Sequence, residues 1–283
     1  IQTEILSIYD GLIDFYQQQG MTDARLLLML DKLNYQGNDI SRGGVNEKLR
    51  LTDEQVIILL KQWAEEFSAS PLCGEVYCQL AERYDRMQDY TAKLHAAQTG
   101  LKKYPQSPSA NDLKEQAAEE LTPRLMVESP FAYPAREVDL KVKYRNLTGL
   151  TVELYRMNLP VTSNILEREI TASTVSQYGK LVGTRHYQLA ATPDYMETDT
   201  LLRYKFPTEG IYILKSIPDG HSKYTAYGKA YVSSLQAISL GLPGGKQEIN
   251  IIDRLTGHPV AGTEVAYYRV LQGEGYRLVK AYP

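Results

Sequence analysis

The spacing of apolar side chains changes once along this chain, near residue 122. Before that point, apolar residues recur every third or fourth position, which is the period of an amphipathic helix. After Pro123 they alternate with polar residues in short runs, which is the period of a half-buried strand. The pattern predicts an α+β multidomain protein, with helices at the N-terminal end and antiparallel β layers after them.

The first helix is expected to bury a stripe of apolar residues at helical spacing, formed by Ile5, Ile8, Leu12, Phe15 and Tyr16. Gly20 should end this helix, because glycine readily adopts the left-handed conformation that follows a helix. Thr22 or Asp23 should cap the second helix with its side-chain oxygen. Residues 34–50 contain three glycines and few apolar positions, so they are expected to form a loop.

Later helices start at recognisable capping residues. Thr52 is followed three positions later by Gln55, the spacing of a capping box. Ser70-Pro71, Asp89 and Ser107-Pro108 mark three further helix starts. Small residues at 81, 92 and 96 would let antiparallel helices approach closely. The run Gly100–Pro108 resembles the turn that ends a tetratricopeptide unit, although no clean repeat of about 34 residues is present. We expect a helical-hairpin, tetratricopeptide-like domain over residues 1–122.

The next part of the chain is predicted to form one Ig-like antiparallel β-sandwich over residues 123–234. Alternation is clearest at Val138, Leu140, Val142 and Tyr144, and it resumes at Leu150 after a turn at 146–149. Further runs follow at 181–189, 202–206 and 211–214. This gives about seven short strands, the number in a simple Ig-like sandwich. Gly210 should turn the chain, and Tyr212 should lie at a corner of the sandwich.

Residues 235–283 are predicted to begin a second sandwich. Alternating residues flank a turn in Gln247–Val270, with Thr256-Gly257 and Pro259 as turn formers. We expect its two arms to pair with each other as a β-hairpin. A sandwich needs about 100 residues, so this second one would be incomplete here and the chain would be a piece of a longer protein.

Three stretches resemble one protein family. Residues Asp253–Val265 (DRLTGHPVAGTEV) are similar to the D-x-x-T-G-x-P-V-x-G-A-x-V turn of macroglobulin-type domains. Leu202–Leu214 resembles a late L-x-x-G-x-Y-x-L hairpin of such a domain, and Tyr231–Leu235 resembles the strand that crosses into the following domain. The chain from Arg124 onward therefore resembles bacterial α2-macroglobulin-like proteins of the type found in Bacteroidetes.

The resemblance implies a role in protease trapping, in which a bait segment is cleaved and a scaffold of macroglobulin domains rearranges around the protease. This chain would supply scaffold only. Its implied partners are other macroglobulin-type domains of the same chain and a protease. The implied location is the periplasm or the cell surface, as a secreted or lipid-anchored protein. The alternative is a cell-surface binding module of an adhesin or glycan-uptake system, in which the helical hairpins and the sandwich contact a ligand.

Composition narrows the function classes further. The hydrophobic fraction of 43% and charged fraction of 23% are those of an ordinary globular protein. A net charge of −3 without a basic stripe argues against a nucleic-acid partner. No apolar run is long enough to cross a membrane.

Candidate chemistry centres first on sulfur. Cys73 and Cys78 should point to different sides of one helix, so we expect two buried thiols and no disulfide. The sequence Cys73-Gly74-Glu75-Val76 nearly matches a Cys-Gly-Glu-Gln thioester, but Val76 stands where the acyl-donating glutamine is needed.

The remaining polar groups give no catalytic set. The four histidines (His95, His186, His221 and His258) are far apart in sequence. Asp194, Glu197 and Asp199 share one loop and are the strongest calcium candidates, without EF-hand spacing. The pairs Glu65-Glu66 and Glu119-Glu120 and the run Glu167–Glu169 are expected to be solvated. The glycine-bearing loops 41–44 and 242–245 lack the setting of a phosphate site, and Asn146-Leu147-Thr148 is expected to be a turn.

Two segments, 157–164 and 171–179, could form recognition surfaces. The sequence therefore assigns no catalytic residue, no cofactor-binding residue and no metal ligand. It predicts that the protein is not an enzyme and has no cofactor.

Overall fold

The structure, a computed structural model, describes residues 1–283 except 39, 129, 161–164, 245, 272–274 and 283. The chain divides into two compact units. The helical unit comprises Ile1–Thr122 and the short segment Pro193–Met196, and the β unit comprises Pro123–Thr192 and Glu197–Pro283. Helices followed by antiparallel sheets confirm the predicted α+β class.

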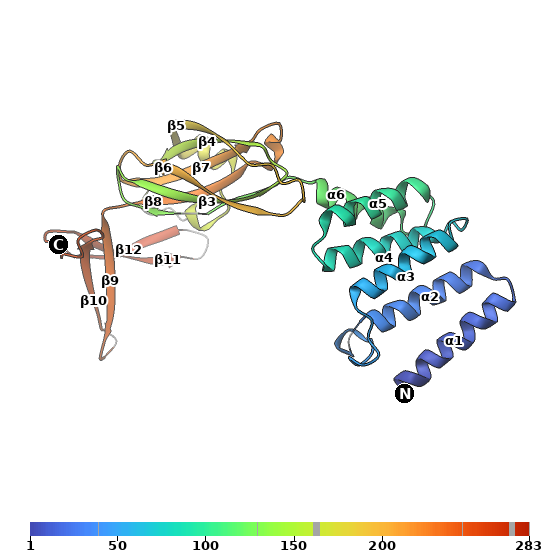
Figure 1. The fold of residues 1–283 in the computed structure, drawn as a ribbon. Helices are drawn as coiled ribbons and strands as arrows, with labels where there is room; N and C mark the ends of the chain where they lie inside the picture. Colours follow the sequence, from blue (N-terminus) through green and yellow to red (C-terminus); the bar gives the residue numbers. More distant parts are fainter. Residues whose placement is uncertain (39, 129, 161–164, 245, 272–274, 283) are drawn as a thin grey trace. The chain divides into compact units, whose positions relative to one another are not determined.

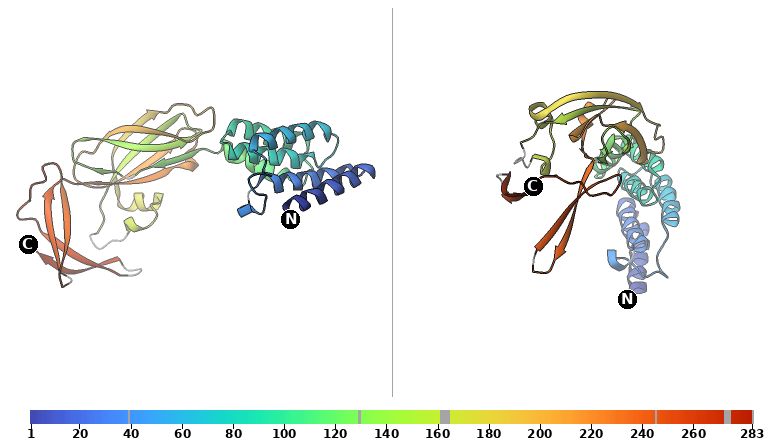
Figure 2. Two further views of the ribbon diagram at one scale, coloured as in Figure 1. Left: turned by 60° about the horizontal axis from the view of Figure 1, so that its bottom comes forward. Right: turned by 90° about the vertical axis from the view of Figure 1, so that its left-hand side faces the viewer.

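Six α-helices form the helical unit: α1 (Gln2–Gln18), α2 (Thr22–Gly37), α3 (Asp53–Glu66), α4 (Cys73–Arg86), α5 (Tyr90–Lys103) and α6 (Ala110–Leu121). A short 3-10 helix, η1 (Ile40–Arg42), lies in the loop after α2. Consecutive helices pack against one another in a row (Figures 1 and 2). Their core is formed by Leu26, Leu30, Leu33, Val56, Leu60, Val76, Ala81, Ala97 and Leu113, among others. The finer tetratricopeptide-like assignment stays a prediction.

Two predicted caps are confirmed. In α3, the Gln55 backbone N–H donates to the Thr52 hydroxyl at 3.3 Å, and the Thr52 N–H donates to the Gln55 side chain at 3.0 Å. In α5, the Ala92 N–H donates to the Asp89 carboxylate at 3.0 Å. Both caps satisfy backbone donors that the first helical turn leaves unpaired.

Three other cap assignments are wrong. Met21, rather than Thr22 or Asp23, stands at the N-cap of α2, because Asp23 instead accepts a hydrogen bond from the Ser70 hydroxyl at 2.6 Å. Ser70 does not cap α4, whose N-cap is Leu72. Ser109, not Ser107, precedes α6. Ser107 packs so tightly under α4 that a Cβ added at Gly74 would lie 2.3 Å from its hydroxyl oxygen.

The predicted buried face of α1 is also wrong for most of its length. Ile8, Leu12 and Phe15 are 62%, 42% and 51% exposed. The side that is buried or half-buried carries Leu6, Tyr9 and Ile13, together with Ile5 and Tyr16. Helical periodicity identifies an apolar stripe, but it does not reveal on which side the neighbouring helix lies. In α1 two apolar sides are adjacent, and α2 covers one of them.

Two sheets form the body of the β unit. The first, in the order β1-β3-β6, contains Arg124–Val127, Glu137–Arg145 and Thr198–Lys205. The second, in the order β2-β8-β7-β4-β5, contains Phe131–Ala132, Ala226–Val232, Gly210–Pro218, Gly149–Met157 and Gly179–Gln188. The pairings are antiparallel except that β2 lies parallel to β8. The α7 helix (Ala172–Tyr178) and two 3-10 turns, η2 (Ile165–Glu167) and η3 (Ser222–Tyr224), complete this part.

One core lies between the two sheets. Val142 and Tyr144 of β3 pack with Leu150 and Val152 of β4 and with Leu214 of β7. The predicted corner residue Tyr212 is fully buried, and its hydroxyl donates to the Thr208 carbonyl at 2.9 Å. The alternation of apolar residues thus predicted these strands correctly, while the Ig-like assignment stays a prediction.

Four more strands follow: β9 (Leu235–Leu242), β10 (Lys246–Asp253), β11 (Val265–Leu271) and β12 (Gly275–Tyr282). β10 pairs with β9, and β11 pairs with β12. The predicted hairpin between the two arms of Gln247–Val270 is therefore wrong. Alternation identifies a strand but not its partner. Across the turn, the end of β10 pairs with the nearby residues 258–260, through an isolated bridge between Ile252 and Pro259 and the bonds Asp253 N–H to His258 carbonyl and Val260 N–H to Ile251 carbonyl, both at 2.9 Å. The assignment of residues 235–283 to a separate sandwich stays a prediction.

Candidate functional site

The turn after β10 is held by one aspartate. A single oxygen of Asp253 accepts the backbone N–H groups of Leu255 and Thr256 at 2.9 and 2.8 Å, and it also accepts the Thr256 hydroxyl at 3.1 Å. The Gly257 N–H then donates to the Asp253 carbonyl at 2.9 Å. Gly257 has φ +72°, a conformation that glycine adopts without steric cost. The Asp-x-x-Thr-Gly pattern therefore encodes a self-contained turn.

The same turn is tied to residues far away in sequence. The other Asp253 oxygen accepts the Tyr133 hydroxyl at 3.0 Å. The Arg254 guanidinium donates to the carbonyls of Ala132 and Ser233, both at 3.0 Å, and the Arg254 N–H donates to the Ser234 carbonyl at 2.8 Å. The end of β2 and the connection from β8 to β9 are thus both fastened to the end of β10.

A second carboxylate holds the opposite side of this connection. Glu209, in the turn between β6 and β7, accepts the Ser234 backbone N–H at 2.9 Å and also the Ser234 hydroxyl. We call Ala132, Tyr133, Glu209, Ser233, Ser234, Asp253 and Arg254 the joint cluster. It brings together all three stretches that resemble macroglobulin-type domains, because Glu209, Ser233 and Ser234, and Asp253 each belong to one of them.

Charge stabilises the joint cluster. The N–H of Thr256 and its other donors lower the pKa of the Asp253 carboxyl, and the Ser234 hydroxyl and N–H lower the pKa of Glu209. The hydrogen bond to Asp253 raises the pKa of Tyr133. Both carboxyls are therefore ionised acceptors near neutral pH, the state in which such hydrogen bonds are strongest. This arrangement orients backbone segments and presents no activated nucleophile.

A small hollow adjoins the joint cluster. Its volume is about 480 Å³, and its lining includes Phe131, Tyr231, Leu235 and Arg254. Phe131 is 70% exposed and stacks on Tyr231 with ring centroids 5.3 Å apart. An exposed aromatic pair beside a cavity is a surface on which a flat apolar group can rest.

The structure places the four histidines apart, as the sequence predicted. His186 lies 2.8 Å from the Asp219 carboxylate at an exposed position. His221 lies beside the Tyr224 ring, and His258 is exposed in the Asp253 turn. His95 is exposed on α5. None of the described residues forms a group of three or more His, Cys, Asp or Glu that could hold a metal ion.

The calcium candidates have other partners. Glu197 pairs with Arg124 at 3.0 Å and with Lys143 at 3.3 Å. Asp194 accepts the Met196 N–H at 3.2 Å, and Asp199 lies opposite Lys143 in the ladder of β3 and β6. Glu197 thus pairs with two cations, and Asp194 holds a local turn.

One acidic assignment is wrong. Glu120 is 1% exposed, and it accepts a hydrogen bond from the equally buried Lys93 at 2.6 Å. Its neighbour Glu119 is half exposed, and its carboxylate lies 3.3 Å from the same lysine. The pair was expected to be solvated, but α6 packs against α5 and turns one of the two inward. Glu65, Glu66 and the run Glu167–Glu169 are exposed, as predicted.

Both thiols are buried and free, which confirms the prediction for Cys73 and Cys78. Burial raises the pKa of the Cys73 thiol, and it raises that of Cys78 to about 12. A thiolate is the reactive form of cysteine, so neither group is activated.

The predicted recognition segments are partly structural. Val175 of α7 is buried in a small cluster with Met157, Ile170 and Ile213. Residues 161–164 of the other segment lie outside the described part of the chain. Asn146 adopts φ +56° in the turn between β3 and β4, as expected of that position.

Several solved structures are similar to this chain. No protein-family model matches this chain, and no curated protein matches it. A crystal structure of native α2-macroglobulin from Escherichia coli spanning domains MG0-NIE-MG1 is 16% identical, covers 51% of this chain and 49% of that one, and gives a TM-score of 0.42. A second structure of that protein, spanning domains NIE-MG1, is 13% identical, covers 57% of this chain and 82% of that one, and gives a TM-score of 0.38.

The third is a superoxide reductase (neelaredoxin) from Ignicoccus hospitalis, which is 17% identical, covers 42% of this chain and 87% of that one, and gives a TM-score of 0.23. This chain spans about half the length of the first of these structures. With all three TM-scores below 0.5, these similarities leave family membership and function open.

Proposed function

We propose that this chain is a non-catalytic scaffold segment of a bacterial α2-macroglobulin-like protein, of the type found in Bacteroidetes, and that it contributes to protease trapping. The observation that carries the proposal is the joint cluster. Three stretches that resemble macroglobulin-type domains are separated by many residues, yet Glu209 of one accepts the Ser234 N–H of the second, and Arg254 of the third donates to the Ser233 carbonyl of the second.

The physical logic is that a scaffold must hold successive β layers at fixed angles while larger parts move as rigid bodies. The joint cluster fixes the point where the chain leaves the two-sheet core and enters β9. Arg254 contributes two hydrogen bonds to carbonyls, and Asp253 and Glu209 contribute charged acceptors. Charge-assisted bonds of this kind are about twice as strong as neutral ones.

This role implies partners and a location. The partners are other macroglobulin-type domains of the same protein and the protease that is trapped. The location is the periplasm or the cell surface. Among the described residues, no helix is both long enough and apolar enough to cross a membrane.

The test uses the full-length product of the gene that encodes this chain. Endopeptidases of the four mechanistic classes are incubated with it, and hydrolysis of a large protein substrate is compared with hydrolysis of a short peptide substrate. A trap protects the large substrate and leaves the short one accessible. The 283-residue chain alone is expected to protect neither.

The variant Arg254→Met should reduce protection of the large substrate, because the guanidinium then no longer bridges the carbonyls of Ala132 and Ser233. Leu255→Ala is the matched control, since Leu255 is in the same turn, is 53% exposed and contributes to the turn through its backbone N–H. The proposal fails if the full-length protein protects no large substrate from any of the endopeptidases.

A second candidate function, a cell-surface binding module, is favoured by one observation. The stacked pair Phe131 and Tyr231 borders a hollow and leaves most of Phe131 exposed. Titration calorimetry of the chain with soluble oligosaccharides would support this function if binding occurs and Phe131→Ala abolishes it.

A further inference from the structure

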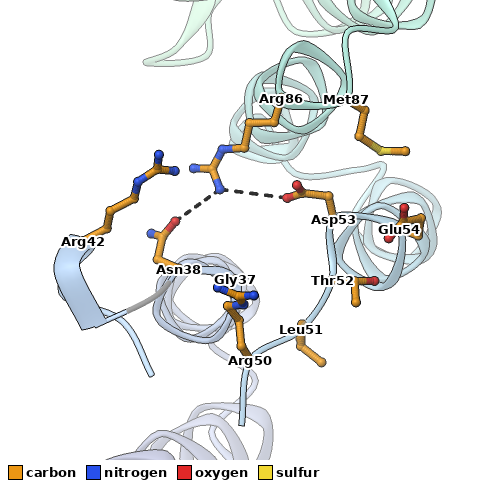
Figure 3. A pocket seen from close by; sticks show the side chains of 10 residues that line it. All are labelled: Gly37, Asn38, Arg42, Arg50, Leu51, Thr52, Asp53, Glu54, Arg86 and Met87. Carbon is orange, nitrogen blue, oxygen red and sulfur yellow. Dashed lines mark hydrogen bonds and ion pairs between the residues drawn. The ribbon is translucent and has the colours of Figure 1, made fainter. Parts of the chain in front are cut away.

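A separate pocket in the helical unit is lined by three arginines from different elements (Figure 3). Arg42 comes from η1, Arg50 from the loop before α3, and Arg86 from the end of α4. The pocket has a volume of about 620 Å³. Its remaining lining consists of Gly37, Asn38, Leu51, Thr52, Asp53, Glu54 and Met87. We call this the arginine pocket.

The loop that forms one wall of the arginine pocket is fixed to its surroundings. The Val45 N–H donates to the Asn38 carbonyl at 3.1 Å, and the Leu51 N–H donates to the Gln36 carbonyl at 2.9 Å. Gly44 approaches so closely that a Cβ there would lie 2.1 Å from the Asn38 carbonyl oxygen. Asn46 is also bound to Gln2 of α1 at 2.8 Å. The wall is therefore pre-formed, which lowers the entropy cost of binding.

Arg83 connects the helices beneath this pocket. It is 2% exposed and donates to the Gly37 carbonyl, to Asp53 and to Asn34, each at 3.2 Å. Burial, followed by repulsion from Arg86, lowers the pKa of Arg83. The guanidiniums of Arg83 and Arg86 both approach the carboxylate of Asp53. One carboxylate cannot neutralise two cations, so Asp53 does not neutralise the site fully.

Two of the arginines, Arg50 and Arg86, have donor groups left to offer. Arg86 donates to the Asn38 side chain at 3.2 Å and lies 3.9 Å from Asp53 (Figure 3). Arg50 is exposed and has no ion-pair partner among the residues that the structure describes. Each guanidinium carries five N–H donors in a planar fork. The first residues of α3 line the same pocket, and a helix N-terminus adds partial positive charge.

The shape and the mixed charge of the pocket lining favour a carboxylate over a phosphate dianion. A guanidinium fork matches the two oxygens of a carboxylate. The pocket is larger than one carboxylate requires, and Leu51 and Met87 offer apolar surface beside the arginines. Asp53 and Glu54 disfavour a dense multiple charge such as a phosphate dianion, but they can accept N–H groups of a peptide backbone.

We propose that the arginine pocket binds a peptide segment through a carboxylate, with an apolar side chain of the same segment against Leu51 and Met87. The carboxylate comes either from an acidic side chain or from a chain terminus. This inference does not depend on the scaffold function proposed above.

The test is a titration of the isotopically labelled 283-residue chain, followed by the backbone amide signals of Asp53 and Glu54. Three tripeptide probes are used. Acetyl-Leu-Glu-Leu-amide carries a side-chain carboxylate, acetyl-Leu-Gln-Leu carries a terminal one, and acetyl-Leu-Gln-Leu-amide carries none. At least one of the first two should give saturable shifts, the third should give none, and the stronger of the first two identifies the source. Inorganic phosphate serves as the fourth probe and should bind more weakly than the better peptide.

The variant Arg50→Gln should weaken binding of the better peptide about tenfold, which corresponds to about 1.4 kcal/mol. Arg50 is chosen because its side chain is exposed and makes no ion pair with any residue that the structure describes. The substitution should therefore leave the fold unaffected, and an unchanged unfolding midpoint checks this. Lys102→Gln is the control, because Lys102 is an exposed cation of the same unit outside the pocket. The proposal is overturned if no carboxylate probe saturates, if the uncharged peptide binds equally well, if phosphate binds more tightly than both carboxylate probes, or if Arg50→Gln leaves affinity unchanged.

Discussion

Two arginines, one in each unit, both donate hydrogen bonds to backbone carbonyls but differ in how deeply they are buried. Arg83 in the helical unit and Arg254 in the β unit each lie beside or against an aspartate and donate to backbone carbonyls. Arg83 is almost fully buried, whereas Arg254 is half-buried. Burial removes water as an alternative partner for the Arg83 guanidinium, and its loss should leave three part-buried acceptors without this donor. The loss of Arg254 should matter less, because Arg254 is half-buried and the Ala132 carbonyl also accepts the Ser233 N–H at 3.1 Å.

The two units also differ in how other buried polar side chains are paired. The helical unit buries a second cation, Lys93, against Glu120. Burial alone would lower the pKa of Lys93, but hydrogen bonds to Asp85 and Glu120 outweigh it, so the pKa is raised. The core of the β unit instead contains tyrosines whose hydroxyls donate to carbonyls, as Tyr144 does to Ala190 at 3.0 Å. The helical unit therefore pairs its buried cations Arg83 and Lys93 with carboxylates, and its stability should respond to the removal of either cation.

The largest expected effect comes from Arg83→Met. Removing one partner of a buried ion pair typically costs about 3–5 kcal/mol. The fluorescence of Trp63, the single tryptophan of the chain, reports on the helical unit because this residue lies in α3. Its urea midpoint should fall, while amide hydrogen exchange in β3 and β4 of the β unit, followed over the same urea range, should keep its transition. An equal shift of both signals would contradict the division described above.

Arg254→Met should cost less, about 1–2 kcal/mol, because Arg254 is half-buried and the Ala132 carbonyl keeps the Ser233 N–H as a second donor. The loss should appear as faster amide hydrogen exchange at Ser234 and in β9. The Trp63 transition should not move. A loss as large as that of Arg83→Met would show that burial is not what separates the two arginines.

Gly37→Ala tests the role of Arg83 without removing the arginine itself. A Cβ at this position would lie 2.9 Å from one terminal nitrogen of Arg83 and 3.0 Å from the other. The guanidinium must then shift and stretch its bonds, at a cost of about 1 kcal/mol. The Trp63 midpoint measures the change. Gly11→Ala is the control, because a Cβ at Gly11 meets nothing within 4 Å and alanine favours a helix.

The smallest effect should be the acid response of the Asp253 turn. Its folded pKa is depressed, so its contribution is complete above the unfolded value of about 3.9 and disappears as pH falls through the folded pKa. Amide exchange at Leu255 and Thr256, corrected for intrinsic rates, should be constant from pH 7 to pH 5 and should rise below about pH 4. Asp253→Asn should abolish that dependence, and a response centred near pH 6 would contradict it.

The sequence predicted the elements of the fold better than their partners. The change of period at residue 122, the capping box at Thr52, the N-cap at Asp89 and the alternating strands are all local patterns, and each is present in the structure. The buried face of α1, the burial of Glu120 and the pairing of β10 with β9 were predicted wrongly. These depend on which neighbour packs where, and such contacts have no short-range signature.

The candidate sites follow the same division. The turn around Asp253 could be predicted because its bonds lie within a few residues. The links from Tyr133 and Glu209 to that region span long stretches of chain, so they required the structure. The arginine pocket was not predicted, because Arg42, Arg50 and Arg86 form no motif and become neighbours only when α2, α3 and α4 pack.

The uncovered side of α1 has a consequence for engineering. Ile8, Leu12 and Phe15 form a largely exposed apolar stripe on α1, on a different side from the one that α2 covers. A further helical hairpin could be grafted there by matching apolar residues at helical spacing, without redesigning the original bundle. Each added hairpin would lengthen the row of helices at α1 and would leave the packing of the other helices unchanged.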